Sequence, residues 1–364
     1  MRQRVDRIFA ALETEVDAIV LWNASSHLTD STFKYVSGVT RGGYEGCAAV
    51  LRKGLRPTLL VSTLEEESAH TASDSDVVAF QSQPALREIL QITLASPRRL
   101  GVNADALVLA KANLLRELFD GVELVDVSAA ISAARLVKDS DEIERVRHAC
   151  DITNEVAADI PSMLREGLTE VQLAARIEQA IQSRGGRAAF NTIVCFGKNG
   201  SEPHYSPGDV PLRRGDMILV DFGSQWSDYC SDITRMYLFG GASSEQRAMF
   251  DVVRQAQASA LELMRAGVAG KRVHQRAKEV IDATEFAGRF IHGTGHSIGL
   301  DVHDGGGLND ASEIMLAPGM ILTVEPGVYV PGAGGVRIED TVLVTADGPE
   351  VLTTVTKDLV EVAV

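Results

Sequence analysis

Hydrophobic and polar positions alternate between helical and strand patterns along the first third of the chain. A helical pattern opens it, and the apolar run DAIVLW (17–22) predicts a strand. The segment CAAVLRKGLRPTLLVS (47–62) predicts two strands around a Lys-Gly turn. Helical PALREILQITL, strand-like RRLGVNA, helical LVLAKANLLRELF and strand-like VELVDV follow. This alternation is typical of an α/β domain.

The pattern changes near residue 128. From residue 129 to residue 167, charged residues recur at helical spacing and predict a long helical stretch. We therefore expect an α/β N-terminal domain over residues 1–128 and a second domain over residues 129–364. A chain of 364 residues is long enough for two domains, each with its own core.

The second domain repeats itself. The segment PLRRGDMILVDFG (211–223) matches LAPGMILTVEPG (316–327), so that Asp221 falls opposite Glu325, 104 residues later. Upstream, residues 164–181 align with residues 264–281 at a shift of 100. Each copy runs helix, loop, strand, turn, strand. The repeat predicts two α+β halves related by an approximate two-fold axis, with the paired sheet in the middle.

Two aspartates flank the first predicted turn. Asp221 and Asp232 lie in two strand-like runs on either side of the polar segment SQWSD. Opposed residues of an antiparallel hairpin have a constant index sum, and for this pair the sum centres the turn between Trp226 and Ser227. We therefore expect the two aspartates to face each other on one side of the sheet.

Two glutamates have the same arrangement in the second copy. Glu325 and Glu339 are predicted to be opposed around Gly332, inside the turn segment PGAGG. Four carboxylates directed towards one axis repel each other unless a cation lies between them. Their charge matches two divalent ions, and carboxylates with imidazole suit Mn²⁺, Co²⁺ or Zn²⁺. Two such ions about 3.5–4 Å apart can share a hydroxide and lower its pKa for a hydrolysis.

Three histidines gather in HGTGHSIGLDVHDGGG (292–307), a stretch that contains six glycines. His292 and His296 would share one face of a helix, but glycine costs about 1 kcal/mol in a helix interior, so we expect strand or loop here. One histidine would complete the metal site. The glycines are expected where the backbone runs close to metals and ligand.

Each of these residues also has an ordinary structural interpretation. Asp221 alone is a common turn former or helix cap, and the run Glu325-Pro326-Gly327 can be a plain strand exit. A single histidine such as His292 is more often a hydrogen-bonded structural residue. Two centred hairpins, a repeat that aligns one carboxylate with another, and a histidine cluster together favour the metal site.

Composition excludes several classes of function. Hydrophobic residues at 45% and charged residues at 23% are typical of a soluble globular protein, and no apolar run reaches a membrane span. The start lacks a secretory signal, so a cytoplasmic location is expected. With 35 basic and 50 acidic residues and no basic block, nucleic acid is not an expected partner. The four cysteines form no CxxC pair and are expected to be reduced thiols.

Five motifs carry a family resemblance. NGSEPHY, VDFGSQWSDYCSDITR, HGTGHSIGLDVHD, TVEPGVY and GVRIED resemble, in order and spacing, the prolidase and Xaa-Pro aminopeptidase family of pita-bread metallopeptidases. The resemblance covers both halves of the chain and implies a pita-bread catalytic domain after a smaller creatinase-type α/β domain. That extra domain is carried by the proline-directed members, which disfavours a methionine aminopeptidase. A homodimer and small peptide substrates are also implied.

The resemblance further implies five metal ligands. Asp221 is the terminal ligand of one ion, His296 and Glu325 bind the other, and Asp232 and Glu339 bridge the two. A metal-bridging hydroxide is then the nucleophile. Glu325 is implied as the proton shuttle from that water to the leaving nitrogen.

Four more residues are assigned by the resemblance to the substrate's surroundings. His204 stands beside the substrate, His303 stabilises the scissile carbonyl as it becomes tetrahedral, and His292 lines the pocket. Arg337 matches an arginine beside the bridging glutamate, where it orients carboxylates or meets the substrate's own carboxylate. A purely structural ion pair is the alternative for Arg337.

The chain departs from the family pattern at two places. Met236 stands where relatives usually have threonine, and Ser201-Glu202 replaces the small or apolar residues common before the Pro-His pair. Both departures are expected near the pocket, where they would affect the choice of substrate.

The favoured function is therefore a dinuclear metallopeptidase that cuts Xaa-Pro bonds. It would act on dipeptides, as a prolidase, or on the amino end of short peptides, as an Xaa-Pro aminopeptidase. The alternatives are an amidohydrolase like creatinase or ectoine hydrolase, and a binding protein that retains the fold. Creatinase works without metal, and non-catalytic members generally lose ligands, so the intact ligand set argues against both.

Overall fold

The computed structural model describes residues 1–24 and 29–363 and divides into two compact units, Met1–Arg135 and Leu136–Val364. The boundary expected at residue 128 falls at the first residue of helix α6 (Ser128–Leu136), which ends at this division. Among the described residues, no helix is both long and apolar enough to cross a membrane.

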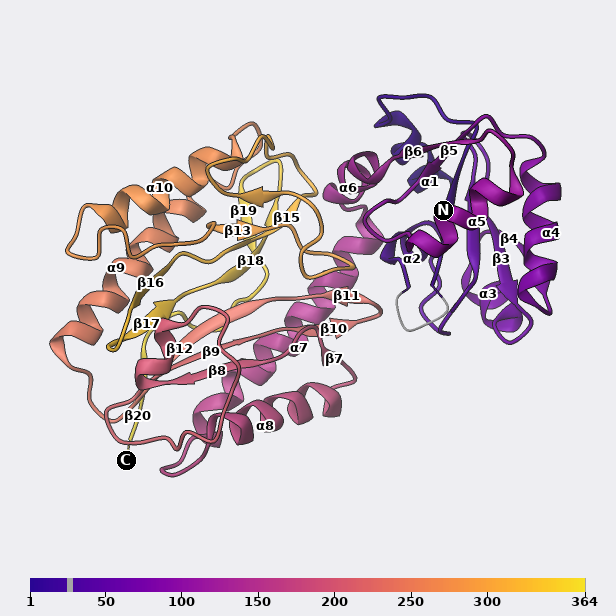
Figure 1. The fold of residues 1–364 in the computed structure, drawn as a ribbon. Coiled ribbons are helices and arrows are strands. Elements are labelled where there is room, and N and C mark those ends of the chain that lie inside the picture. The colour runs from indigo at the N-terminus through magenta and orange to yellow at the C-terminus, as the bar shows by residue number, and fades with distance from the viewer. Residues whose placement is uncertain (25–28, 364) are drawn as a thin grey trace. The chain divides into compact units, whose positions relative to one another are not determined.

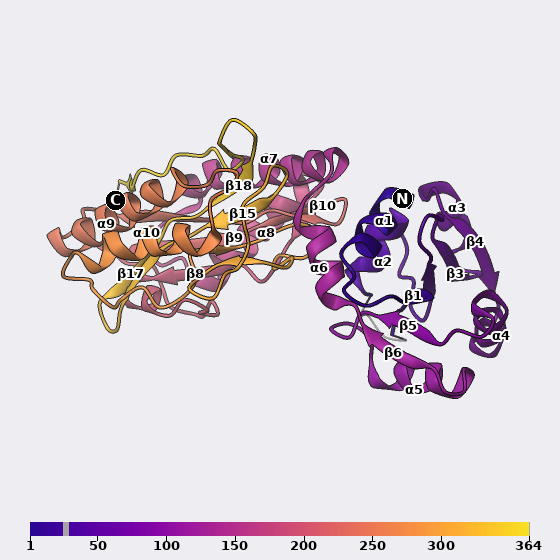
Figure 2. The same cartoon turned by 90° about the horizontal axis from the view of Figure 1, so that it is seen from above.

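The first unit is built on one six-stranded mixed sheet with the strand order β4-β3-β2-β1-β5-β6. Helices lie on both faces of this sheet (Figure 2), so the predicted α/β class is confirmed. The predicted Lys-Gly turn joins two antiparallel strands, β2 and β3. Its elements are α1 (Arg2–Ala10), β1 (Ala18–Trp22), α2 (Ser31–Ser37), β2 (Ala48–Leu51), β3 (Thr58–Ser62), α3 (Glu66–Ala72), β4 (Asp76–Phe80), α4 (Gln83–Leu94), β5 (Arg99–Val102), α5 (Leu109–Leu118) and β6 (Glu123–Asp126). The sequence patterns did not identify α2, α3 or β4.

The second unit places two pairs of helices around several sheets, with α7 and α8 on one side and α9 and α10 on the other (Figure 1). The strand pairs of these sheets are antiparallel except for β12 and β20, which are parallel. The first half contains α7 (Ser140–Met163), α8 (Glu170–Ser183), β7 (Arg187–Ala188), β8 (Ile193–Phe196), the 3₁₀ helix η1 (Gly197–Ser201), β9 (Met217–Phe222), β10 (Ser224–Trp226), β11 (Tyr229–Cys230) and β12 (Ile233–Phe239). The remainder contains α9 (Ser244–Leu261), α10 (Gly270–Asp282), β13 (Gly295–His296), β14 (Gly307–Leu308), β15 (Ile321–Val324), β16 (Gly327–Val330), β17 (Gly334–Arg337), β18 (Asp340–Val344), β19 (Pro349–Val351) and β20 (Val360–Val362).

The predicted duplication is present in the backbone. Thr169 forms an isolated antiparallel bridge with Pro211, and Ala269 forms the same bridge with Met315, at the predicted shifts of 100 and 104. The same shifts relate two backbone hydrogen bonds, from Gly167 to Leu212 and from Gly267 to Leu316. The two halves therefore have the same backbone arrangement at these positions, and we call this arrangement their shared frame.

Side-chain alternation turns the carboxylates of each half away from its own helices. In β9, Ile218 and Val220 pack in the core formed with α7 and α8, so Asp221 lies on the opposite face of the strand. In β15, Leu322 packs in the core formed with α9 and α10, so Thr323 and then Glu325 lie on the opposite face.

The first hairpin differs from its predicted register. Asp221 pairs with Thr234, so the expectation that it directly opposes Asp232 is wrong. The cause is the turn, because Ser227 and Asp228 both have positive φ, 49° and 68°, as the tight primed hairpin turn requires. The turn is therefore centred between these two residues. A displacement of two positions along β12 leaves Asp232 on the same face of the sheet as Thr234.

The second hairpin has its predicted register. Gly327 pairs with Arg337 in β16 and β17, and Val324 pairs with Asp340 in β15 and β18. Glu325 and Glu339 lie between these two ladders and are opposed, as predicted.

Candidate metal centre

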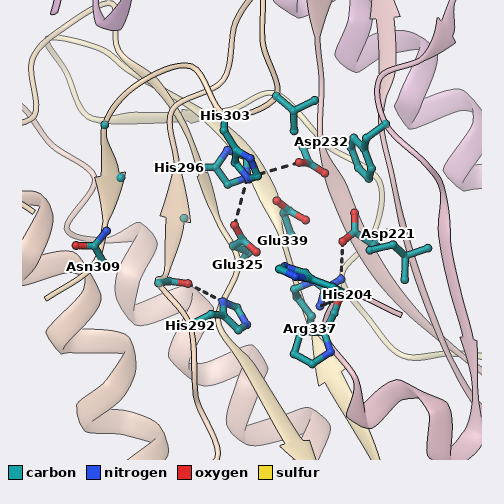
Figure 3. Close-up of a pocket in the computed structure, with 18 residues that line it drawn as sticks. His204, Asp221, Asp232, His292, His296, His303, Asn309, Glu325, Arg337 and Glu339 are labelled. Atoms are coloured by element: carbon teal, nitrogen blue, oxygen red, sulfur yellow. Dashed lines mark hydrogen bonds and ion pairs between the residues drawn. The ribbon is translucent and has the colours of Figure 1, made fainter. Parts of the chain in front are cut away.

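A cavity of about 580 Å³ lies in the second unit, and Figure 3 shows the side chains around it. Every residue that the sequence assigned to the site lines this cavity. The lining residues are Phe190, Ile193, Pro203, His204, Asp221, Asp232, His292, Gly293, Gly295, His296, Val302, His303, Gly306, Gly307, Asn309, Glu325, Arg337 and Glu339.

The predicted ligands converge at the centre of this cavity (Figure 3). Ligand atoms of Asp232, His296 and Glu339 all lie within 4.8 Å of one another. The Nε2 atom of His296 lies 3.7 Å from a carboxylate oxygen of Asp232 and 3.4 Å from one of Glu325. Side chains from β9 and the β11–β12 connection thus meet His296 of β13 and side chains that follow β15 and β17.

His296 is held in the tautomer that suits a ligand. Its Nδ1 atom lies 3.3 Å from the carbonyl oxygen of Ser297. A carbonyl can only accept, so Nδ1 carries the proton and Nε2 offers its lone pair towards the carboxylates. Burial lowers the pKa of His296, which keeps the ring neutral. Neutral imidazole with a hydrogen-bonded second nitrogen is the usual form of a metal-binding histidine.

Three buried carboxylate oxygens are unsatisfied. Within the described part of the chain, Asp221 Oδ1, Asp232 Oδ1 and Glu339 Oε1 are buried without a hydrogen-bond partner. Burial raises the pKa of Asp232, as does the charge of Glu339; burial likewise raises that of Glu339, as does the charge of Glu325. Burying a carboxylate oxygen without a hydrogen-bond partner lowers the stability of the folded protein. Divalent cations would bind these oxygens and cancel the repulsion between the carboxylates. The residues present therefore fit a metal centre.

Arg337 connects the two halves. Its Nη2 atom donates to Asp221 across 2.5 Å, and its Nε atom donates to the hydroxyl of Thr234 across 3.1 Å. Thr234 in turn donates to Glu339 across 2.6 Å. The guanidinium thus contacts a carboxylate of the site, one of the arrangements expected from the sequence. Thr234 was not identified from the sequence, because its role depends on a residue of the other half.

His292 has both ring nitrogens engaged. Its Nδ1 atom donates to the carbonyl of Gly293 across 2.7 Å, so Nε2 accepts from the hydroxyl of Tyr329 across 2.8 Å. Tyr329 also accepts from Arg337 across 2.9 Å, and burial raises its pKa to about 12. Tyr329 was not identified from the sequence as a site residue. Its place in the motif TVEPGVY is the sequence signal that could have identified it.

His303 and His204 complete the histidine surroundings. The ring of His303 lies edge-on to that of His296, with centroids 4.2 Å apart. Burial lowers the pKa of His303, so this ring too is neutral near pH 7. His204 follows η1 and reaches the cavity from the first half of the unit.

Two glycines of the histidine stretch are packed against neighbouring backbone. A β-carbon on Gly295 would lie 1.9 Å from the carbonyl oxygen of Thr323, and one on Gly293 would lie 3.1 Å from that of Leu308. At these two positions the backbone of the protein itself excludes a side chain. Gly293, Gly295, Gly306 and Gly307 also line the cavity, so the backbone of this stretch runs close to the site, as expected. The predicted strand or loop is confirmed, since only the short pair β13 and β14 interrupts loop here.

The two departures from the family pattern do not line the cavity. Met236 is buried in the hydrophobic core, with 2% of its surface exposed. Ser201 donates to the carbonyl of Lys198, and Glu202 is exposed. Neither departure lines the cavity, although Ser201-Glu202 directly precede the lining residues Pro203 and His204.

Comparison with known proteins agrees with this geometry. Residues 144–346 match Metallopeptidase family M24, and residues 2–137 match the Creatinase/Prolidase N-terminal domain. An Xaa-Pro dipeptidase of Pyrococcus furiosus is 33% identical over 89% of this chain and 91% of its own length. The structure of an Xaa-Pro dipeptidase from Bacillus anthracis superposes with a TM-score of 0.91, at 28% identity over 99% of both chains. An X-Pro aminopeptidase from Thermotoga maritima gives 0.90, at 28% identity over 98% of this chain and 100% of its own.

Proposed function

The chain belongs to metallopeptidase family M24, and from that premise we propose that it hydrolyses Xaa-Pro bonds, in dipeptides or at the amino end of short peptides. Dipeptides are the favoured substrates. The observation that carries this proposal is that Asp232 and Glu339, each with an unsatisfied buried carboxylate oxygen, lie together with His296 as a group that could hold a metal ion. As a member of the family the chain is a peptidase that uses divalent metal, with a pita-bread catalytic domain.

Two divalent ions are proposed, with Mn²⁺ or Co²⁺ ahead of Zn²⁺. Their ligands would be Asp221, Asp232, His296, Glu325 and Glu339. The match between four carboxylates and two divalent charges supports the number of ions. The neutral tautomer of His296 supports its ligation.

The side chains of the cavity divide the chemical work. When bound, the ions supply an activated water and polarise the scissile carbonyl. Glu325, whose pKa is raised by burial, takes the proton of the water and passes it to the leaving nitrogen. His303 donates a hydrogen bond to the carbonyl oxygen as the carbonyl carbon becomes tetrahedral, and His204 stands beside the substrate. His292 closes the pocket wall, and Arg337 orients Asp221.

The similar proteins include a dipeptidase and an aminopeptidase, and the two activities differ in the peptide that they cleave faster. Rates of hydrolysis of Ala-Pro and Ala-Pro-Ala with Mn²⁺, Co²⁺ and Zn²⁺ distinguish them. A prolidase cleaves Ala-Pro faster, and an aminopeptidase cleaves the tripeptide faster. Failure to cleave either peptide with any of the ions would refute the proposal, and equal cleavage of Ala-Ala would remove the preference for proline.

Two further proposals rest on the resemblance and composition alone. These are the homodimer and the cytoplasmic location. Size-exclusion chromatography with light scattering tests the first, and cell fractionation tests the second. The amidohydrolase alternative gains support only if a non-peptide amide is cleaved by protein that fails on both proline peptides.

A further inference from the structure

Glu170 is a buried carboxylate outside the metal centre. It is the first residue of α8 and has none of its surface exposed. Its two carboxylate oxygens accept four hydrogen bonds. The donors are Phe196 N at 2.7 Å, Asn199 Nδ2 at 2.9 Å, Tyr205 Oη at 2.9 Å and Gly208 N at 3.2 Å.

All of these donors belong to one segment, the loop 196–208, which starts at the last residue of β8, contains η1 and carries His204 to the cavity. Tyr205 follows His204 directly and is held by Glu170. On the other side of His204, the carbonyl of Pro203 accepts from Arg337 across 3.4 Å. Both neighbours of His204 are therefore anchored, and Glu170 supplies one of the anchors.

The charge of Glu170 is well placed to hold this loop. It lies in the first turn of α8, where the helix dipole favours an anion. Hydrogen bonds to a carboxylate are about twice as strong as neutral ones. Since the carboxylate oxygens of Glu170 are buried, each loop donor forms its hydrogen bond with the carboxylate and not with water.

The duplication shows that the shared frame does not need this carboxylate. The residue equivalent to Glu170 in the second half is Gly270, which follows the bridge from Ala269 to Met315. A β-carbon on Gly270 would lie 2.7 Å from Ser312 Oγ, so a glutamate has no room there. The same bridge thus forms with and without an acidic residue, and the carboxylate occurs in the half that carries His204.

We propose that Glu170 is a positioning residue that fixes the loop 196–208 so that His204 faces the substrate. This inference rests on the proposed function, because the contact between His204 and a substrate belongs to it. It adds a residue to the reaction that touches neither the metal ligands nor the cavity.

A double-mutant cycle tests this coupling. Glu170→Gln is expected to lower kcat/KM for Ala-Pro by about 10-fold to 100-fold, since displacing a group in the site by about 1 Å has that effect. The loss should vanish when the substitution is made in His204→Ala protein, because the misplaced group is then already absent. Equal losses in both backgrounds would make Glu170 a purely structural residue and overturn the proposal.

Glu142 provides the matched control. It is also buried, lies in the first turn of α7, and accepts from Tyr229 Oη at 3.1 Å and from the backbone N–H of Asp139 at 3.0 Å. Glu142→Gln should lower stability, and any loss of kcat/KM that it causes should be the same with and without His204. If its loss also vanished in His204→Ala protein, the cycle would report general loosening, and the specific role of Glu170 would be refuted.

Amide hydrogen exchange gives a readout that is independent of activity. In metal-free protein, Glu170→Gln should raise exchange in residues 196–208, whereas Glu142→Gln should leave it unchanged. Unchanged exchange in the Glu170 variant would overturn the proposal. If the wild type cleaves no peptide, the proposed function fails and loop exchange alone decides this inference. If Glu170→Gln does not fold, Tyr205→Phe removes one donor and undergoes the same cycle and the same exchange measurement.

Discussion

The two halves of the second unit share a frame, and each contributes two carboxylates to one site. The first half contributes Asp221 and Asp232, and the second contributes Glu325 and Glu339. Each half also supports a carboxylate of the other, since Thr234 donates to Glu339 and Arg337 donates to Asp221. Duplication therefore explains where four carboxylates meet, and the cross-contacts explain why the halves act as one site.

Removing, from either half, one of the two carboxylates proposed to bridge the ions should have the largest effect. Asp232→Asn and Glu339→Gln should each lower Ala-Pro hydrolysis by roughly a thousandfold, because several kcal/mol of transition-state stabilisation are lost. Metal content by mass spectrometry should fall in both. If only one of the two variants were affected, the equal contribution of the halves would be refuted, and full activity with full metal content would remove that residue from the bridge.

Removing the arginine that joins the halves should have the next largest effect. Arg337→Met leaves Asp221 buried without its cation and should lower the free energy of unfolding of metal-free protein by about 3–5 kcal/mol. Arg254→Met breaks an exposed pair with Asp358 and should cost about 0–1 kcal/mol. Urea unfolding measures both. Similar small losses for the two variants would show that Arg337 does not hold the halves together.

Thr234 offers a smaller test of the cross-contact. Thr234→Val keeps the shape but removes the hydroxyl between Arg337 and Glu339, and should weaken metal binding by about 10-fold to 100-fold. Thr345→Val, at the far end of β18, should leave metal affinity unchanged. Metal titration calorimetry distinguishes them, and equal affinities would mean that Thr234 does not support the site.

The carboxylates should make metal-free protein less stable as pH rises. Burial raises the pKa of Asp232 and Glu339 above the usual 3.8 and 4.5, so the folded state binds more protons than the unfolded state above those values. Their contribution is complete below the usual values and is lost as pH rises towards the raised ones. The buried histidines have lowered pKa values and act in the opposite sense, but only below their usual 6.5.

Above pH 6.5, the histidines no longer offset the effect of the carboxylates on stability. From there upwards, the free energy of unfolding in a chelator should fall as pH rises, by up to about 1.4 kcal/mol per pH unit for each carboxylate that still holds its proton. Asp232→Asn should flatten this slope, and bound metal should remove it by displacing the protons. A flat profile for the metal-free wild type would show that these carboxylates do not hold protons.

The smallest effect concerns the turns. Gly332 has φ of 83° in the second hairpin, so Gly332→Ala should cost about 1–2 kcal/mol through backbone strain alone, with no neighbour in contact. Gly241 has open space and an ordinary φ, so Gly241→Ala should cost less than Gly332→Ala. Thermal unfolding compares the two variants, and equal costs would remove the strain argument.

The two hairpins also show what the sequence can predict. The register around Gly332 followed from the index sum of two glutamates, because the turn is symmetric about it. The predicted register of the first hairpin was wrong by two positions, because Ser227 and Asp228 adopt positive φ without the Asn-Gly or Asp-Gly pair that signals such a turn. Alternation still placed Asp232 on the correct face.

The residues missed from the sequence share a physical reason. Thr234, Tyr329 and Glu170 act through hydrogen bonds, and for Thr234 the partner lies about a hundred residues away. No local spacing encodes such contacts. The four carboxylates were predictable because their shared charge requires a cation, whereas the choice of His296 came from the family resemblance. The groups that orient these residues are chosen by the tertiary structure.

One measurement tests the central claim most directly. Crystals grown with Mn²⁺ or Co²⁺ and measured at the metal's absorption edge should show two anomalous peaks per chain, about 3.5–4 Å apart. Both should lie among Asp221, Asp232, His296, Glu325 and Glu339. A single peak, or peaks outside this group, would contradict the claim that the two halves together build one dinuclear centre.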